Sequence, residues 1–313
     1  MTIASFETEP QPCRLPSSDL DLVLQAPIKT WDEGIPLGSG LLGGLLWGGG
    51  STLNVSLDRG DLWDERSAKG MQWEKFTYRN LVDLVKKKDR ASIDDIFERA
   101  YSDVHPSKLP GGRLVIDLGS TEEIKSFRLS LADAMGKVSL ASGKTIEALW
   151  SGKEQAGVFF VPGDRFPTLK LMTPAMVAAQ GAASAGPDSH GVKALGYPDA
   201  EFGSADGLTW YVQEAAQGLR YVALAGVKRV KGGSRIAVTL CSTLDGRDPL
   251  SIAKKKIKVI LNKEESALKA PHQAWWKKFW SASRLEVPDK QILSHYALVR
   301  YFYGAASRQG SPP

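Results

Sequence analysis

A short run between Leu57 and Asp64 gathers the side chains that are best suited to chemistry. It reads Leu-Asp-Arg-Gly-Asp-Leu-Trp-Asp, with three carboxylates, one guanidinium and one indole around a glycine. Carboxylates and Arg offer directional hydrogen bonds to sugar hydroxyls, and an indole offers a flat apolar face on which a pyranose ring can stack. Paired carboxylates are also what glycoside hydrolysis requires. Asp58, Asp61 and Trp63 are therefore candidate substrate-binding residues.

The same run also fits a purely structural turn. In that interpretation Asp58 and Asp61 cap backbone N–H groups, and Arg59 pairs with a neighbouring side chain. On the chemistry of the run alone, the structural interpretation is the favoured one.

Nine tryptophans extend the search for a ligand site, because indoles often line sugar subsites. Trp210 alternates with Leu208 and Val212 as a core strand residue does, and a C-terminal group has the spacing of a buried helix face: Trp275, Trp276 and Trp280. Three others lie in turn-like or polar settings and are candidates for ligand contact: Trp31, Trp63 and Trp73.

Other chemistries lack the necessary pattern. The four histidines show no metal-ligand spacing, and no Gly-x-Ser-x-Gly nucleophile motif is present. The glycines from Gly38 to Gly50 bracket a strand-like segment and lack the helix and Lys of a phosphate-binding loop, so we interpret them as tight turns at a sheet edge. We therefore predict no metal and no cofactor.

Composition narrows the class of protein. The 313 residues are 42% hydrophobic and 24% charged, with two cysteines, which is typical of a globular chain that needs no disulfides. No apolar run is long enough to span a membrane, and no export signal is visible, which makes the cytoplasm the default compartment unless the true start lies upstream. A net charge of +5 does not favour nucleic-acid binding.

Short strand-like runs punctuated by Gly, Pro, Asp and Ser must position the candidate residues. Apolar residues fall at every second position in several of them, for example at Phe127, Leu129 and Leu131. Because strands and helices do not alternate regularly, the pattern predicts an antiparallel β-sandwich rather than a doubly wound sheet. One exception is the segment 78–101, whose apolar spacing of three and four predicts two short helices with a break at residues 89–92.

The pattern changes after Asn262, where two helices are expected. Pro271 suits the opening turn of the first, and Pro288 suits the start of the second. Between Ile292 and Tyr303 the second helix is apolar on nearly every side, so it must be covered all round. We expect that cover from a longer protein of which these residues are the front part; packing on the sandwich or self-association is the alternative.

The residues at both ends resemble a known family. The segment 31–43, Trp-Asp-Glu-Gly-Ile-Pro-Leu-Gly-Ser-Gly-Leu-Leu-Gly, resembles the opening motif of family 95 glycoside hydrolases, the inverting α-L-fucosidases and their relatives. Segment 57–63 is similar to their Leu-Asn-x-Asp-x-Leu-Trp motif, and 301–313 to a stretch in the first helix of their catalytic barrel. Ser39 and Asp58 stand where the family usually has Asn.

This resemblance implies an architecture and an activity. The chain would comprise an extended or disordered N-terminus at 1–18, a β-sandwich (super-sandwich) at 19–262, a linker helix at 263–287 and the start of an (α/α)6 barrel at 288–313. The intact protein would be an inverting exo-glycosidase acting on oligosaccharides, with its catalytic residues in the barrel beyond Pro313 and none in this chain. A non-catalytic carbohydrate-binding or scaffold module, and an inverting sugar phosphorylase of similar layout, remain alternatives.

Overall fold

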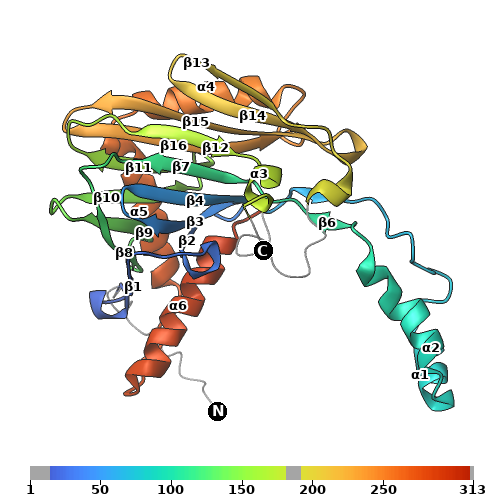
Figure 1. The fold of residues 1–313 in the computed structure, drawn as a ribbon. Coiled ribbons are helices and arrows are strands. Elements are labelled where there is room, and N and C mark those ends of the chain that lie inside the picture. The colour runs from blue at the N-terminus through green and yellow to red at the C-terminus, as the bar shows by residue number, and fades with distance from the viewer. Residues whose placement is uncertain (1–14, 181–191, 311–313) are drawn as a thin grey trace, which may run out of the picture.

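The chain forms two antiparallel β-sheets packed face to face in a computed structural model that describes residues 15–180 and 192–310 (Figure 1). Over these residues the larger sheet, here sheet A, has nine strands in the order β1-β8-β9-β10-β11-β16-β15-β14-β13. Their bounds are β1 Leu22–Gln25, β8 Ile124–Ser130, β9 Met135–Leu140, β10 Thr145–Ser151, β11 Ala156–Pro162, β16 Gly233–Ser242, β15 Arg220–Val230, β14 Leu208–Glu214 and β13 Glu201–Ala205.

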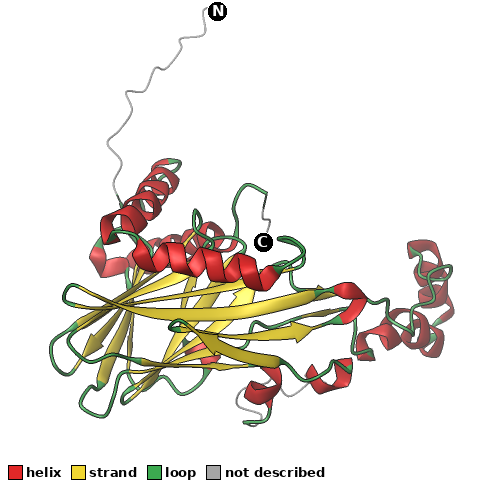
Figure 2. Ribbon diagram, turned by 90° about the horizontal axis from the view of Figure 1, so that it is seen from above, coloured by secondary structure: helices red, strands yellow, loops and turns green. Residues whose placement is uncertain are grey.

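The smaller sheet, here sheet B, has five strands in the order β12-β7-β4-β3-β2. Their bounds are β12 Thr168–Met172, β7 Arg113–Asp117, β4 Thr52–Arg59, β3 Leu42–Gly49 and β2 Ile35–Gly38. Within the described residues, a third pairing joins only β5 Trp63–Asp64 to β6 Ser107–Lys108. The predicted β-sandwich is confirmed, and Figure 2 shows the stacked strands from above.

The core lies between the two sheets because alternate residues of each strand point inward. In β4 the buried positions include Leu53, Val55 and Leu57, while Asn54 and Ser56 between them are only partly buried. Phe127 and Leu129 on β8 face the same core from sheet A. The second face of sheet A buries a separate apolar cluster beneath helix α4, Pro249–Asn262.

A helical arm projects from the sandwich between β5 and β6 (Figures 1 and 2). It occupies the segment where the spacing predicts two short helices, and it contains α1 Tyr78–Lys87, α2 Arg90–Ile93, a π-helical turn Asp94–Glu98 and a 3-10 turn Arg99–Ser102. The break lies at Lys88, which has a left-handed backbone, and at Asp89, whose side chain caps α2. It is shorter than the predicted break at 89–92, because α2 already begins at Arg90.

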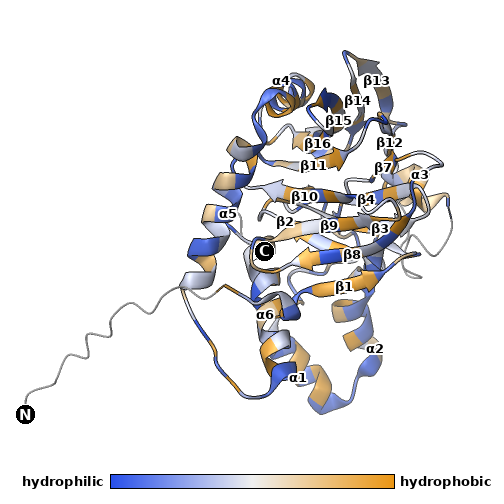
Figure 3. Ribbon diagram, turned by 90° about the vertical axis from the view of Figure 1, so that its left-hand side faces the viewer, coloured by the Kyte–Doolittle hydropathy of each residue, from blue (hydrophilic) through white to orange (hydrophobic). Residues whose placement is uncertain are grey.

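Three C-terminal helices pack on different parts of the sandwich: α4, α5 Glu265–Ser281 and α6 Lys290–Ala306. Helix α4 covers β15 and β16 of sheet A, α5 contacts β10 of the same sheet, and α6 packs against β2 of sheet B (Figures 1 and 3). Strands were expected up to Asn262, but α4 already begins at Pro249, because its lysines alternate with apolar residues at helical spacing. Pro271 lies inside α5 rather than at its start, and α6 begins two residues after Pro288, capped by Asp289.

Several shorter elements complete the described chain. They are 3-10 turns at Ser18–Leu20, Trp31–Glu33, Val192–Leu195 and Ala216–Gly218, and the helix α3 Pro174–Ala178. Most of the expected N-terminal segment 1–18 lies outside the described residues, as do 311–313. Among the described residues, no helix combines the length and the apolar character needed to cross a membrane.

Candidate functional site

A groove of about 1150 Å³ runs over the outer face of sheet B. Its floor comes from two cross-strand rows, which the strand register aligns as Pro36, Leu45, Ser56 and Arg113 in one row and Gly38, Gly43 and Asp58 in the next. Because the second row contains two glycines, the floor lacks side chains there. Its walls are the C-terminal end of α6, helix α3 and the root of the arm from residues 101 to 108.

Three of the five residues predicted to contact a ligand line this groove, namely Trp31, Asp58 and Trp63, whereas Asp61 and Trp73 do not. Trp31 and Trp63 have exposed fractions of 38% and 46%, so each indole presents much of its surface to solvent. The Trp63 indole N–H donates to the Gly60 carbonyl at 3.0 Å, and the Gly60 N–H donates to the Leu41 carbonyl at 2.8 Å. These bonds fix the indole at one end of the groove. Whether the three residues bind substrate stays a prediction.

Asp58 forms an ion pair across the groove wall. Lys108 Nζ lies 2.6 Å from Asp58 Oδ1 and also donates to the carbonyls of Arg59 and Leu109. The predicted backbone capping by Asp58 is replaced by this pairing. The ammonium group is therefore held in place, and the pair brings no net charge to the groove.

Asp61 is not among the residues that line the groove. It binds Arg59, whose guanidinium is 2% exposed and lies 2.6 Å from Asp61 Oδ1 and 2.5 Å from Asp245 Oδ2. Arg59 also donates to the Leu240 carbonyl at 3.1 Å, which ties β4 to sheet A. The expectation that Arg59 pairs with a neighbour holds, and Asp61 has a structural role in this network.

Arg113 is a groove residue that the sequence reasoning missed. It is 5% exposed, lies over the Trp47 ring at 4.5 Å from the centroid, and donates to Gln180 Oε1 at 2.8 Å. No carboxylate among the described residues pairs with it, and burial lowers the pKa of its guanidinium. Its signal was a charged residue that opens the otherwise apolar strand run at 113–116.

A buried polar cluster fixes the root of the arm beside the groove. Asp64, 1% exposed, accepts hydrogen bonds from Arg66 at 2.6 Å and from the Tyr197 hydroxyl at 2.5 Å. Burial by itself would raise the pKa of Asp64, but the bonds from Arg66 and Tyr197 hold it at about 2. His105, at the other end of the arm, contacts the Arg66 carbonyl at 3.1 Å.

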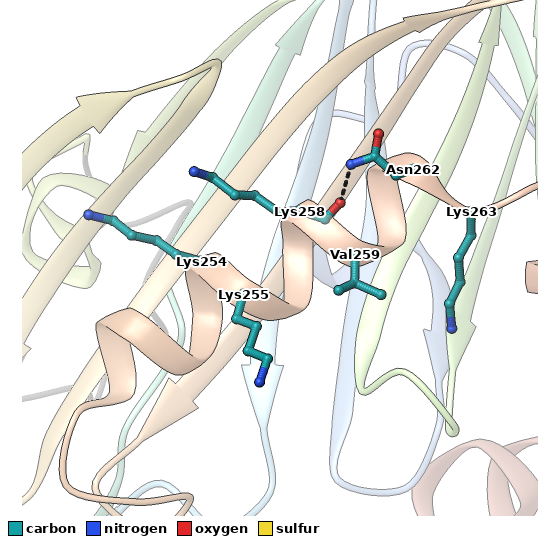
Figure 4. A pocket seen from close by; sticks show the side chains of 6 residues that line it. All are labelled: Lys254, Lys255, Lys258, Val259, Asn262 and Lys263. Atoms are coloured by element: carbon teal, nitrogen blue, oxygen red, sulfur yellow. Dashed lines mark hydrogen bonds between the residues drawn. The ribbon is translucent and has the colours of Figure 1, made fainter.

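A second hollow lies on the outer surface of α4, between its lysines (Figure 4). The ammonium groups do not converge: Figure 4 shows Lys254 and Lys258 pointing to one side and Lys255 and Lys263 to the other. Lys258 pairs with Asp206 and Lys263 with Glu154, at 2.9 and 2.5 Å. This surface is a solvated helix face and not an anion site.

Two carboxylates that line the groove already have partners. Asp58 pairs with Lys108, and Asp103 accepts from the Gly70 N–H at 2.8 Å. Within residues 15–180 and 192–310, no three His, Cys, Asp or Glu side chains are grouped as metal ligands.

Comparisons with known proteins point to one superfamily. Residues 22–161 match the family model "Glycosyl hydrolase family 65, N-terminal domain". Twelve chains of solved structures match the fold, among them a protein described as a candidate kojibiose phosphorylase from the human microbiome. That match has a TM-score of 0.52 and 10% identity, and it covers 93% of this chain. No curated protein matches the sequence.

The present chain spans 42% of the length of that solved structure. The two similarities therefore give a family 65 N-terminal-domain match over residues 22–161 and a shared fold, built as a sandwich followed by helices. Neither points to family 95, so the finer assignment made from the motifs at 31–43 and 57–63 is not supported.

Proposed function

We propose that the chain is the N-terminal part of an enzyme that cleaves glycosidic bonds with inversion at the anomeric carbon. In this proposal α6 is the first helix of an (α/α)6 barrel, and the barrel carries the catalytic carboxylates. The family 65 match over residues 22–161 supports this assignment, as does the fold shared with a structure more than twice as long.

The observation that carries the proposal is that α6 has two apolar faces. One face packs on the sandwich: Tyr301 is fully buried and its hydroxyl donates to the Pro36 carbonyl at 2.7 Å. The opposite face is exposed over about three turns, at Ile292, Val299, Phe302 and Tyr303. A helix with apolar residues on both sides is typical of a position between two layers, and a barrel would supply the second layer.

The chemistry of such an enzyme needs two groups on opposite sides of the sugar. A carboxylic acid protonates the glycosidic oxygen while a water or a phosphate oxygen attacks the anomeric carbon from the other face. The bond from that carbon to the leaving sugar breaks as the new carbon–oxygen bond forms. Residues of this chain would support the mouth of the site, since the groove ends beside the C-terminus of α6.

The proposed reaction is compatible with two substrate classes. Family 65 similarity and the phosphorylase-like fold favour an α-linked disaccharide cleaved by phosphate or water. The α-L-fucosidase activity expected from the motifs has no support from either similarity and is placed second. A single assay can test both substrate classes.

The test begins with the reading frame beyond the codon for Pro313. The full product is then expressed and incubated with kojibiose, maltose and an aryl α-L-fucoside, with and without inorganic phosphate. Cleavage that needs phosphate identifies a phosphorylase, and cleavage without it a hydrolase. If the frame stops at once, or the longer product cleaves none of the panel, the proposal fails.

A further inference from the structure

We propose that the groove on sheet B is itself a binding site for a neutral oligosaccharide, with Trp63 as its stacking platform. This proposal does not depend on the function proposed above, because it assigns binding to residues of this chain. Three features of the groove support it: its shape, its exposed indole and the pairing of its charged side chains.

The shape suits an extended ligand. A volume of about 1150 Å³ slightly exceeds the range of about 300–1,000 Å³ that is usual for small-molecule sites. The hollow lies over Gly38 and Gly43, where the sheet presents backbone in place of side chains. A Cβ at Gly43 would lie 3.0 Å from the Leu37 carbonyl oxygen. Glycine therefore fits best at this position, and no side chain fills this part of the groove.

The aromatic residues provide the apolar contact that a pyranose ring needs. Trp63 uses its only polar group to bind Gly60, so the position of the ring is set before any ligand arrives. Its exposed ring faces are then free to stack on sugar C–H groups. Asp58, beside Gly43 in the same floor row, is linked to Trp63 through Lys108. Lys108 of β6 pairs with Trp63 of β5, and its ammonium group holds the Asp58 carboxylate.

The charges favour a neutral, hydroxyl-rich ligand. Asp58 and Lys108 neutralise each other, so neither attracts an ion strongly. Arg113, which pairs with no carboxylate in the described part of the chain, is only 5% exposed, because it lies over the Trp47 ring and donates to Gln180. The ion pair engages Oδ1 of Asp58, and a carboxylate has further lone pairs to accept bonds from hydroxyl groups. A purely apolar ligand would leave this pair without new partners. A stacking face beside fixed hydrogen-bonding groups is the combination that recognises sugars.

Isothermal titration calorimetry on the 313-residue chain tests the proposal, with maltotriose and 2′-fucosyllactose as probes. We expect saturable binding of at least one probe. Trp63→Ala should weaken it by about tenfold, the equivalent of about 1.4 kcal/mol of lost stacking. The matched control is Trp73→Ala, because Trp73 is 67% exposed on the arm and does not line the groove. A melting curve for each variant confirms that the chain is folded.

Three other outcomes would overturn the proposal. Absence of heat with both probes overturns the proposal, and so does an equal loss in the Trp63 and Trp73 variants. Binding by this chain that disappears in the longer product would mean that a following domain occupies the groove, which also overturns it. Failure of catalysis in the longer product leaves the binding result intact, so the two proposals fail separately.

Discussion

Arg59 shows how a single buried charge joins the two sheets. Its guanidinium is almost fully buried between Asp61 and Asp245 and also binds a backbone carbonyl of β16. Burial alone would raise the pKa of Asp245, but the bond from Arg59 lowers it. The pair is therefore ionised at neutral pH, and removing one partner leaves a desolvated charge.

We predict that Asp245→Asn lowers the free energy of unfolding by about 2 kcal/mol, because Arg59 then keeps only one carboxylate. Urea denaturation followed by circular dichroism measures this loss. The control is Asp206→Asn, which removes an exposed pair with Lys258 and should change stability by less than about 1 kcal/mol. Equal losses in both variants would contradict the network.

The lowered pKa of Asp64 predicts that the free energy of unfolding depends on pH. Its pKa is about 2 in the folded chain, against 3.8 without these contacts, so the folded state binds fewer protons. The stabilisation is fully present above pH 3.8 and is lost as the pH falls through about 2. Unfolding free energies measured between pH 7 and pH 2 should therefore fall less steeply at acid pH in Asp64→Asn than in the original chain. A parallel pH dependence in the two proteins would disprove the assignment.

Sequence reasoning located part of the groove for a physical reason. Trp31 and Trp63 were found because both indoles lie in polar, turn-like segments, and both are partly exposed in the structure. Arg113 could not be placed because its partner Gln180 lies 67 positions away, and the network around Asp61 could not be foreseen because its partner Arg59 also binds the distant Asp245. Pairings of that kind depend on the order of the strands, which no local pattern encodes.

At the scale of elements, the turn between β2 and β3 forms the seat for α6. The Gly40 N–H donates to the Ala305 carbonyl at 2.8 Å, and Gly40 has a φ of +87°. A Cβ at Gly38 would lie 2.6 Å from the same Ala305 oxygen. The glycines that resemble a family motif thus allow a helix end to approach the sheet backbone, which agrees with the turn interpretation and not with a phosphate loop.

Gly38→Ala should therefore loosen α6. We expect faster hydrogen exchange in residues 290–306 and a loss of about 2 kcal/mol, because the methyl group meets a backbone oxygen that cannot move away without shifting the helix. Gly60→Ala is the control, since its Cβ would have no neighbour nearer than 3.8 Å. Unchanged exchange in the Gly38 variant would show that α6 is held by its side chains alone.

The arm is an element that the sandwich does not need for stability. No residue from 71 to 102 belongs to either core cluster, and its ends meet where the Gly70 N–H binds Asp103. Replacing 71–102 by a short Gly-Ser linker should shift the melting temperature by only a few degrees. The same linker in place of 201–214 removes the buried residues Leu208 and Tyr211 and should abolish cooperative unfolding.

Element types were predictable where the apolar period was clear. The period of two at Phe127–Leu131 and the period of three and four at 78–101 both correspond to the observed strand and helices. Helix α4 was missed because four of the five residues from 254 to 258 are lysines, which interrupt the apolar spacing that would mark a helix. Pro271 was misplaced because α5 gains its stability from packing, with Trp276 and Trp280 buried, and tolerates a proline in its first half.

At the scale of the whole molecule, the helices divide the surface of the sandwich. Helix α4 covers the far face of sheet A, while the outer face of sheet B stays open as the groove. Helix α6 borders that open face: Phe302 lines the groove, and the exposed side chain of Val299 extends the apolar surface beyond it. A helix therefore covers the sheet A side of the molecule, whereas the sheet B side presents an open surface that is suited to contacts.

Two valines of nearly equal exposure, one on each side of the molecule, allow the two sides to be compared. Val299 on α6 and Val259 on α4 have nearly equal exposed fractions, 49% and 47%, so a lysine at either position should leave the 313-residue chain equally stable. In the longer product we expect Val299→Lys to reduce glycoside cleavage at least about tenfold, because a barrel packed on α6 would bury an unpaired charge at a cost of several kcal/mol. Val259→Lys should leave activity unchanged, since α4 already presents lysines to solvent on that face. Melting curves for both chains and initial cleavage rates for both longer products make the comparison, and equal rates would mean that nothing packs against α6.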